Sequence, residues 1–171
     1  MEESEEIDFA SGIQAFESKH FSRAMQLLSP LAASGYADAQ HRCAIMLQNG
    51  LGNRANPEAA FRWMNAAAEQ GHPLAQHGLG FMYMEGDCAE KNGERAAFWF
   101  TKAAEQGLAG SQTTLAMMYE QGTLIEKDEE KKSAATNETI LQLKIHEHLP
   151  LRLNKNVTPW TTLTTVKNLK E

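Results

Sequence analysis

The chain has 171 residues, of which 42% are hydrophobic, and a net charge of −6 at pH 7. This length suits one domain or a short repeat array, and no apolar run approaches the roughly 20 residues that a membrane-spanning helix needs. The acidic balance offers no basic surface for nucleic acid, so neither nucleic acid nor a membrane is an expected partner.

Residues 1–36 predict an N-terminal helical hairpin, with helices over about 5–18 and 20–33. The apolar faces of the two helices contain Gly12 and Phe16 in the first and Ala24, Leu28 and Leu31 in the second. The chain start, MEESEEID, has five acidic residues and no basic one. Such a segment is typical of a solvated, frayed terminus.

A repeat follows this hairpin. Residues 67–71 and 103–107 both read Ala-Ala-Glu-Gln-Gly, and a shift of 36 positions needs no gap from residue 37 to residue 122. The same shift aligns Gly50 with Gly86 and Gly122, Gln40 with Gln76 and Gln112, His41 with His77, Trp63 with Trp99, and Tyr83 with Tyr119. A fixed period of this length is the signature of repeat architectures. We expect units at 37–72 and 73–108, then a degenerate unit with a capping helix at 109–148.

Each full unit predicts two helices, which in the second unit run over about 73–85 and 93–106. Their apolar faces contain Ala75, Leu79, Gly80 and Tyr83 in the first helix and Ala96, Trp99, Ala103 and Ala104 in the second. A glycine inside a helix costs up to about 1 kcal/mol relative to alanine. Gly80 therefore predicts close approach of a neighbouring helix.

The expected helix ends carry capping residues. Asn56 precedes Pro57 and an acidic residue, which is a favourable helix start, and Asn92 and Asp128 hold the same place in the next two units. Gly71 and Gly107 follow the second helices, where a residue with positive φ is preferred. The repeated Glu-Gln-Gly is therefore interpreted as a helix stop with a polar last turn.

These residues resemble the Sel-one-like repeat (SLR) family, a relative of the tetratricopeptide repeats. One full unit matches the family pattern at Ala75, Leu79, Gly80, Tyr83, Gly86, Ala96, Trp99, Lys102, Ala103, Ala104, Glu105, Gln106 and Gly107. The unit before it matches at Ala39, Gly50, Gly52, Ala60, Trp63 and residues 67–71, and the third at Leu115, Tyr119, Gly122, Asp128 and Lys131. The resemblance covers about residues 37–132.

Two departures from the family pattern carry expectations of their own. Cys88 replaces the second loop glycine, so we expect that loop to leave the usual path. Lys132 and Ala135 replace the alanine and tryptophan of the third unit, so its second helix is degenerate. The N-terminal hairpin, with Gly12 and Ala24 at the tetratricopeptide interval, is expected to cap the array.

The resemblance implies an all-α fold, an α-solenoid of antiparallel helix pairs wound into a right-handed superhelix. It also implies a concave face, lined by the first helix of each pair, that binds a protein or peptide partner. The tetratricopeptide binding positions, carried onto residues 37–121, give His41, Ile45, Gln48, Asn49, His77, Phe81, Met84, Glu85, Thr113, Met117, Glu120 and Gln121. Phe81 and Met117 are favoured as apolar contacts, whereas Ile45 alternatively packs between helices.

No pattern for catalysis, a cofactor or a metal stands out. His41 and His77 fall at equivalent positions, but two histidines without a carboxylate or cysteine make a poor metal site. A polar groove lining is the favoured interpretation. Cys43 and Cys88 form no CxxC motif, which argues against both a zinc site and a disulfide-rich scaffold. We expect no metal and no cofactor.

SLR proteins act as adaptors and scaffolds, which makes a non-catalytic protein-interaction scaffold the leading functional hypothesis. Two alternatives stay open: a β-lactam-binding or hydrolysing enzyme like the cysteine-rich SLR proteins, whose paired cysteines this chain lacks, and a structural subunit of a larger complex. No secretory signal pattern is visible, so a cytoplasmic protein with reduced thiols is expected. The oligomeric state is left open.

The C-terminal part predicts a last helix over about 129–147, ended by Pro150. Residues 149–171 form a non-repeat tail rich in threonine. Three interpretations apply to it: an arm packed on the array, a partner-binding segment, or a disordered end. Trp160 favours docking, because a large aromatic side chain gains free energy when it is buried.

Overall fold

The computed structural model describes residues 3–122 and 124–136, and this part of the chain consists of helices and the turns that join them. The helices are α1 (Glu3–Glu17), α2 (Phe21–Ala33), α3 (Ala37–Asn49), α4 (Pro57–Glu69), α5 (Pro73–Glu85), α6 (Gly93–Glu105) and α7 (Ala109–Gln121). Residues 129–136 are also helical. The expected all-α fold is confirmed.

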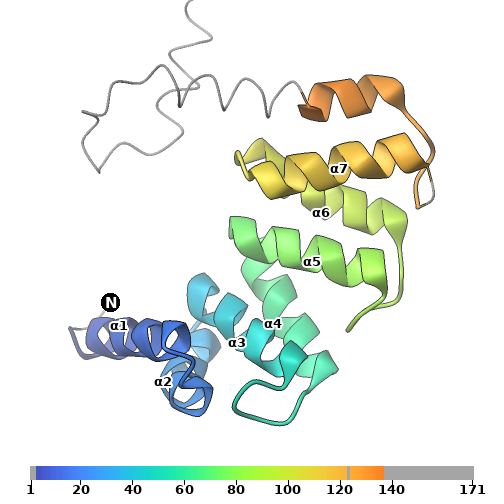
Figure 1. Cartoon of the computed structure of the whole chain (residues 1–171). Helices are drawn as coiled ribbons and strands as arrows, with labels where there is room; N and C mark the ends of the chain where they lie inside the picture. The colour runs from blue at the N-terminus through green and yellow to red at the C-terminus, as the bar shows by residue number, and fades with distance from the viewer. Residues whose placement is uncertain (1–2, 123, 137–171) are drawn as a thin grey trace, which may run out of the picture.

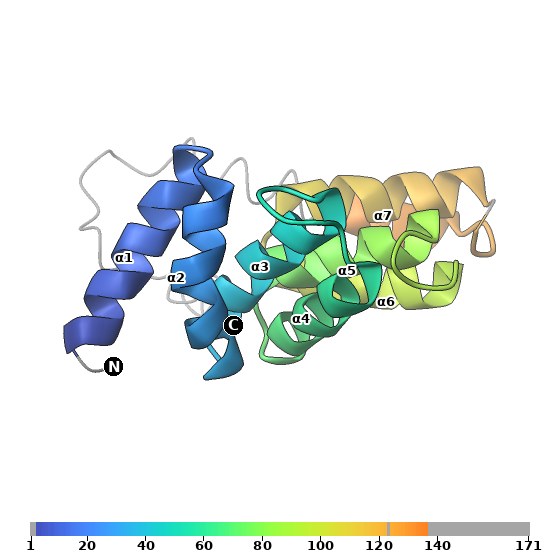
Figure 2. The same ribbon diagram turned by 90° about the horizontal axis from the view of Figure 1, so that it is seen from below.

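Consecutive helices pack side by side and the pairs stack along the molecule. Extensive contacts join each of α1 to α6 to the next helix in the chain. Figure 1 shows this order, with α1 and α2 at one end and the helix that follows α7 at the other. Figure 2, seen from below, shows α1 and α2 running alongside each other before the stack of α3 to α7. This arrangement is the expected α-solenoid.

The helix caps lie where the sequence predicts them. The side-chain oxygens of Asn56, Asn92 and Asp128 accept hydrogen bonds from the third backbone amide that follows, at 3.0, 2.9 and 2.9 Å. These bonds satisfy amides that have no partner inside the helix. Gly71 and Gly107 have φ angles of 87° and 84°, which end α4 and α6 in the left-handed region.

The loop that contains Cys88 corrects one prediction. The sequence predicts that the cysteine diverts this loop, but Cys88 adopts a φ of 63°, close to the 71° of Gly52 at the equivalent position. A non-glycine residue rarely enters this left-handed region. The loop therefore keeps the conformation of its counterpart, at a cost in backbone strain.

Two clusters of buried side chains form the core. One gathers residues of α1, α2 and α3, and the other extends from α3 to Ala135. Trp63 of α4 packs against both clusters. The hydrophobic core is therefore distributed along the stack, as expected of a solenoid.

In α6 the structure corrects the predicted buried stripe. Phe100, and not Trp99, is the fully buried aromatic residue, while Trp99 is only half-buried. A Cβ atom built on Gly80 would lie 2.8 Å from two ring carbons of Phe100. The predicted close approach at Gly80 is thus confirmed, and the ring of Phe100 fills the space that a side chain there would occupy.

Buried glutamines join the units. Gln40, Gln76 and Gln112, called the joint glutamines below, are all at most 5% exposed. Each side-chain amide donates to a backbone carbonyl at the end of the preceding helix: Ala32 at 3.0 Å, Ala68 at 3.2 Å and Ala104 at 3.2 Å. The glutamines of the repeated Glu-Gln-Gly, Gln70 and Gln106, donate to Gln40 and Gln76 at 2.7 and 2.6 Å. The repeated Glu-Gln-Gly motif therefore forms contacts between units as well as ending a helix.

Two expectations fall partly or wholly beyond the described residues. The last helix, predicted over 129–147, is seen over 129–136. The rest of that helix and the tail at 149–171 lie outside the described part of the chain, so their predictions stay predictions. Within the described part, none of the helices is long and apolar enough to cross a membrane.

Candidate functional site

The twelve predicted groove residues lie on α3, α5 and α7, the first helices of the three units. The predicted residues have different surroundings on the three helices. Residues of α5 and α7 line a common surface pocket, whereas those of α3 are mostly engaged in contacts within the protein.

On α3, His41 corrects the prediction of a groove-lining side chain. It is only 7% exposed, because the ring of His72 stacks on it with a centroid separation of 4.9 Å. Burial removes the imidazole from the solvent-facing groove. Ile45 is half-buried against the core, in agreement with the alternative that it packs between helices.

The remaining α3 residues make polar contacts near the end of the helix. The side chain of Gln48 donates to a carboxylate oxygen of Asp87 at 2.6 Å, and that of Asn49 donates to the backbone oxygen of Ile45 at 2.9 Å. Neither residue lines the pocket between α5 and α7. They remain accessible polar positions beside it in the stack.

A pocket of about 520 Å³ lies between α5 and α7. Five predicted groove residues line it: Phe81, Met84, Glu85, Met117 and Gln121. Lys91, Thr114, Met118 and Leu124 complete the lining. Of these nine residues, five are apolar, so the pocket offers an apolar surface with a polar edge.

The two most exposed apolar side chains of this pocket differ in rigidity. Phe81 is 36% exposed and Met117 is 50% exposed. The Phe81 ring packs edge-on against His77 and Phe100, at centroid distances of 4.8 and 5.2 Å. Met117 has a flexible thioether side chain. The pocket therefore combines a fixed aromatic wall with an adaptable one.

His77 supports the aromatic wall. A hydrogen bond of 2.7 Å joins its Nδ1 atom to the hydroxyl oxygen of Ser111 on α7. Burial lowers the pKa of His77 below its usual value of 6.5, because removing an imidazolium from water disfavours the charged form. The neutral ring thus ties α5 to α7 beneath Phe81.

Two predicted residues of α7 lie outside the pocket lining. The hydroxyl group of Thr113 donates to the backbone oxygen of Ala109 at 3.0 Å. Glu120 forms an ion pair with Lys132 at 2.8 Å. This pair directs the carboxylate toward the helix that follows α7.

Four pocket residues lie outside the positions that the resemblance to tetratricopeptide repeats predicts, because those positions fall only at fixed places on the first helices. Lys91 and Leu124 belong to the loops after α5 and α7, and Thr114 and Met118 are the helical neighbours of predicted positions. A signal for the loop residues exists: both follow the left-handed glycines Gly86 and Gly122, which turn the chain back.

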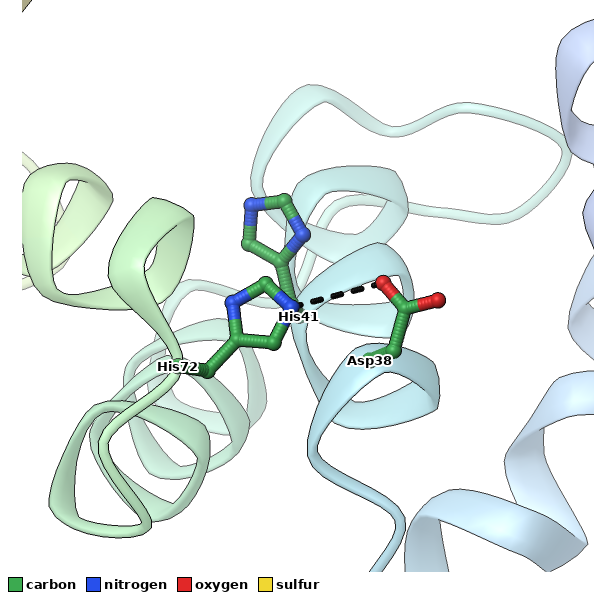
Figure 3. Close-up of side chains that lie close together, drawn as sticks. All are labelled: Asp38, His41 and His72. Carbon is green, nitrogen blue, oxygen red and sulfur yellow. Dashed lines mark ion pairs between the residues drawn. The ribbon is translucent and has the colours of Figure 1, made fainter. Parts of the chain in front are cut away.

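A second cluster of side chains lies where α3 meets the start of α5. Asp38 and His41 belong to α3, and His72 caps α5 (Figure 3). One potential ligand atom from each residue lies within 4.8 Å of the others. The Nε2 atom of His72 is 3.4 Å from a carboxylate oxygen of Asp38.

The environment of this cluster shifts two of its pKa values. Burial, together with the nearby His72, lowers the pKa of His41 to about 4. The hydrogen bond from His72 lowers the pKa of Asp38. At neutral pH His41 is therefore neutral and Asp38 is charged. The repeat places His41 and His77 at equivalent positions. In the structure, however, His77 forms a hydrogen bond with Ser111, and the residues that lie close to His41 are Asp38 and His72.

The two cysteines are free thiols. Burial raises the pKa of Cys43 to about 12, and burial together with Asp87 raises the pKa of Cys88 to about 11. Both stay protonated at neutral pH, and a protonated thiol is a weak nucleophile.

Stacked helix pairs joined by repeated contacts define an α-solenoid repeat protein. The family model of the Sel1 repeat matches residues 37–72, 73–108 and 109–134. These matches span more than half of the chain, which therefore belongs to the Sel1 repeat family. Sel1 repeat proteins generally bind protein partners as scaffolds and are typically non-catalytic.

Two solved structures are similar to this one. The first is a Sel1 repeat protein from Oxalobacter formigenes, with a TM-score of 0.72 and 29% sequence identity, covering 78% of this chain and 55% of that protein. The second is c5321, a protective antigen present in uropathogenic Escherichia coli strains that displays an SLR fold. It has a TM-score of 0.75 and 25% identity, covering 80% of this chain and 30% of that protein. A search of functionally curated proteins found no match.

Proposed function

We propose that this protein is a non-catalytic scaffold that binds a partner protein or peptide in the pocket between α5 and α7. The observation that carries the proposal is the exposure of Phe81 and Met117 on facing helices of one apolar pocket. Apolar side chains gathered at a concave surface favour binding, because they are already partly organised and lose water when a partner covers them.

The lining indicates the kind of segment that fits. Phe81, Met84, Met117 and Leu124 can receive an apolar anchor side chain, and methionine adapts to several shapes. Glu85 and Lys91 at the same pocket offer one charge of each sign. An extended or helical peptide with an apolar anchor and neighbouring polar groups satisfies both features.

The wider groove supplies polar contacts in this proposal. Gln48 and Asn49 on α3 and Thr113 on α7 are accessible and would contact the partner beyond the anchor. Their side chains already hydrogen-bond within the protein, so each would exchange or share a bond. We expect them to tune specificity more than affinity.

The test is affinity capture from lysate with the wild-type protein, the double variant Phe81→Asp/Met117→Asp and the control Phe98→Asp. Phe98 on α6 is 53% exposed but does not line the pocket, so its replacement removes a similar apolar surface elsewhere. Quantitative mass spectrometry should show that a specific set of partners falls about tenfold or more in the double variant. The Phe98 variant should retain that set.

Circular dichroism melting curves check that each variant is folded. A double variant that folds and captures the same partners as the wild type would show that binding uses another surface and would refute the proposed pocket.

The proposal that the protein is non-catalytic is checked separately with a chromogenic β-lactam. We expect no turnover, because Sel1 repeat proteins are typically non-catalytic, and protein-dependent turnover would contradict this part.

A further inference from the structure

Three side chains converge at the joint between the first and second units. Asp38 and His41 are three residues apart, so both lie on the same face of α3 near its start. His72 is the residue that immediately precedes α5. Figure 3 shows a nitrogen of each imidazole ring and the Asp38 carboxylate facing the same space. Their potential ligand atoms all lie within 4.8 Å of one another.

One of these groups is buried without a hydrogen-bond partner. The side chain of His41 is 7% exposed, and its Nδ1 atom has no partner. A buried polar atom left unsatisfied costs about 1–3 kcal/mol, so an occupant that takes its lone pair would stabilise the fold. The neutral imidazole is the form that binds a metal through a ring nitrogen.

We propose that Asp38, His41 and His72 bind one divalent transition-metal ion, with zinc as the representative ion. The donor set supports this class, because imidazole nitrogens favour zinc and its neighbours in the first transition row over magnesium and calcium, which prefer oxygen ligands. Three protein ligands leave a coordination position for water. None of these residues lines the pocket between α5 and α7, so the site is independent of the proposed partner-binding surface.

Zinc binding requires the three ligand atoms to move slightly closer to one another. Ligand atoms around a tetrahedral zinc ion lie about 3.3 Å apart, given zinc–nitrogen bonds of about 2.0–2.1 Å. The pair formed by His72 and Asp38 is already at 3.4 Å. His41 must therefore account for most of the movement, together with small rotations of the other two side chains.

Arg42 supports the carboxylate from the other side. Its guanidinium lies 3.6 Å from Oδ2 of Asp38, whereas His72 faces Oδ1. A ligating carboxylate is commonly held by a second partner through its other oxygen, which fixes its orientation. Arg42 is thus a positioning residue in this proposal, although its positive charge partly offsets the attraction of the carboxylate for the ion.

Metal binding has a structural consequence that a nonspecific surface ion would not have. The Nδ1 atom of His72 now accepts the backbone amide of Ala75 at 3.2 Å. A metal on Nε2 leaves the proton of the neutral ring on Nδ1, which can then no longer accept from Ala75. The amide of Ala75 therefore reports on occupancy by the ion.

The test uses the full chain without an affinity tag, stripped with EDTA and titrated with ZnCl₂ in a calorimeter. We expect one ion per chain, with binding at least about tenfold weaker in Asp38→Asn and in His72→Gln. Both replaced residues are partly exposed, so these variants should fold. Two controls should bind as the wild type: His20→Gln, which removes an exposed histidine, and His146→Gln/His148→Gln, which removes the other histidine pair.

Nuclear magnetic resonance gives the second measurement. At a zinc concentration that just saturates the wild type, the Ala75 amide signal should shift fully in the wild type and much less in Asp38→Asn. The proposal is overturned by the absence of saturable one-to-one binding, by wild-type affinity in either ligand variant, or by loss of binding in the His146/His148 control. An unmoved Ala75 signal at saturation would equally exclude His72 as a ligand.

Discussion

Equivalent residues in successive units have different roles. His41, His77 and Thr113 occupy the same position in three units, yet His41 is buried under His72, His77 bonds to Ser111 and Thr113 is exposed. The repeat pattern predicts the backbone position of each residue but not its neighbour from the next unit. The cluster of Asp38, His41 and His72 could not be predicted for this reason, although histidine at position 72, where the other units have Tyr36 and Leu108, was a visible irregularity.

His77 predicts a pH dependence of stability. Its pKa is lowered in the folded protein, so the unfolded chain binds a proton at a higher pH than the folded one. The stability that the neutral ring contributes is fully present above the ordinary pKa of 6.5 and is lost as the pH falls toward the lower folded value. We expect His77→Gln to lose less stability than the wild type between pH 7.5 and pH 5.

Urea unfolding of both proteins at the two pH values, in the presence of EDTA, measures this effect. The other titrating groups are common to both proteins, so the difference between them isolates His77. Equal losses of unfolding free energy in the wild type and the variant would show that His77 does not titrate differently on folding.

Helices and their caps were the most predictable level of this structure. Each start and stop depends on local chemistry, such as the Asn92 side chain that accepts an amide of the next turn, and a repeat shows that chemistry more than once. The buried aromatic residue of α6 was less predictable. Trp99 and Phe100 are adjacent, and the rotation of the helix, set by contact of Phe100 with Gly80, decides which of them enters the core.

This contact between α5 and α6 predicts opposite outcomes for two glycines inside helices. In Gly80→Ala the new Cβ would lie 2.8 Å from the buried ring of Phe100, and such overpacking costs about 1–3 kcal/mol. In the control Gly110→Ala it would meet His77 at 3.5 Å, an ordinary contact. Alanine should therefore leave stability unchanged there or raise it by up to about 1 kcal/mol.

Chemical denaturation of the two variants tests the pair. Similar stability changes in both would mean that Phe100 moves aside, and that the close approach of the two helices does not depend on glycine.

At the scale of the whole molecule, the contacts that stabilise the fold are distributed along the stack of helices. In the described part of the chain, the core consists of one cluster around α2 and another around α5, and among α1 to α7 extensive contacts join only consecutive helices. In such a linear array each part is stabilised mainly by its neighbours. The ends of the molecule should therefore open without the middle.

Two matched substitutions test this division, because Leu28 and Leu79 are both fully buried, one in each cluster. Each change to alanine should cost about 2–5 kcal/mol. Hydrogen exchange should accelerate mainly in α1 and α2 for Leu28→Ala and mainly in α5 and α6 for Leu79→Ala. Equal acceleration along the described helices in both variants would instead indicate a single cooperative unit.

The joint glutamines have a consequence for how such a chain changes length. Gln76 reaches Ala68, and Gln112 reaches Ala104, through the same bond at the same place in the unit. If residues 73–108 were deleted, Gln112 would face Ala68, which is the same amino acid as the partner it lost. A duplication or deletion of 36 codons would thus keep this hydrogen bond at the new joint, so one buried contact between units survives a change in the number of repeats.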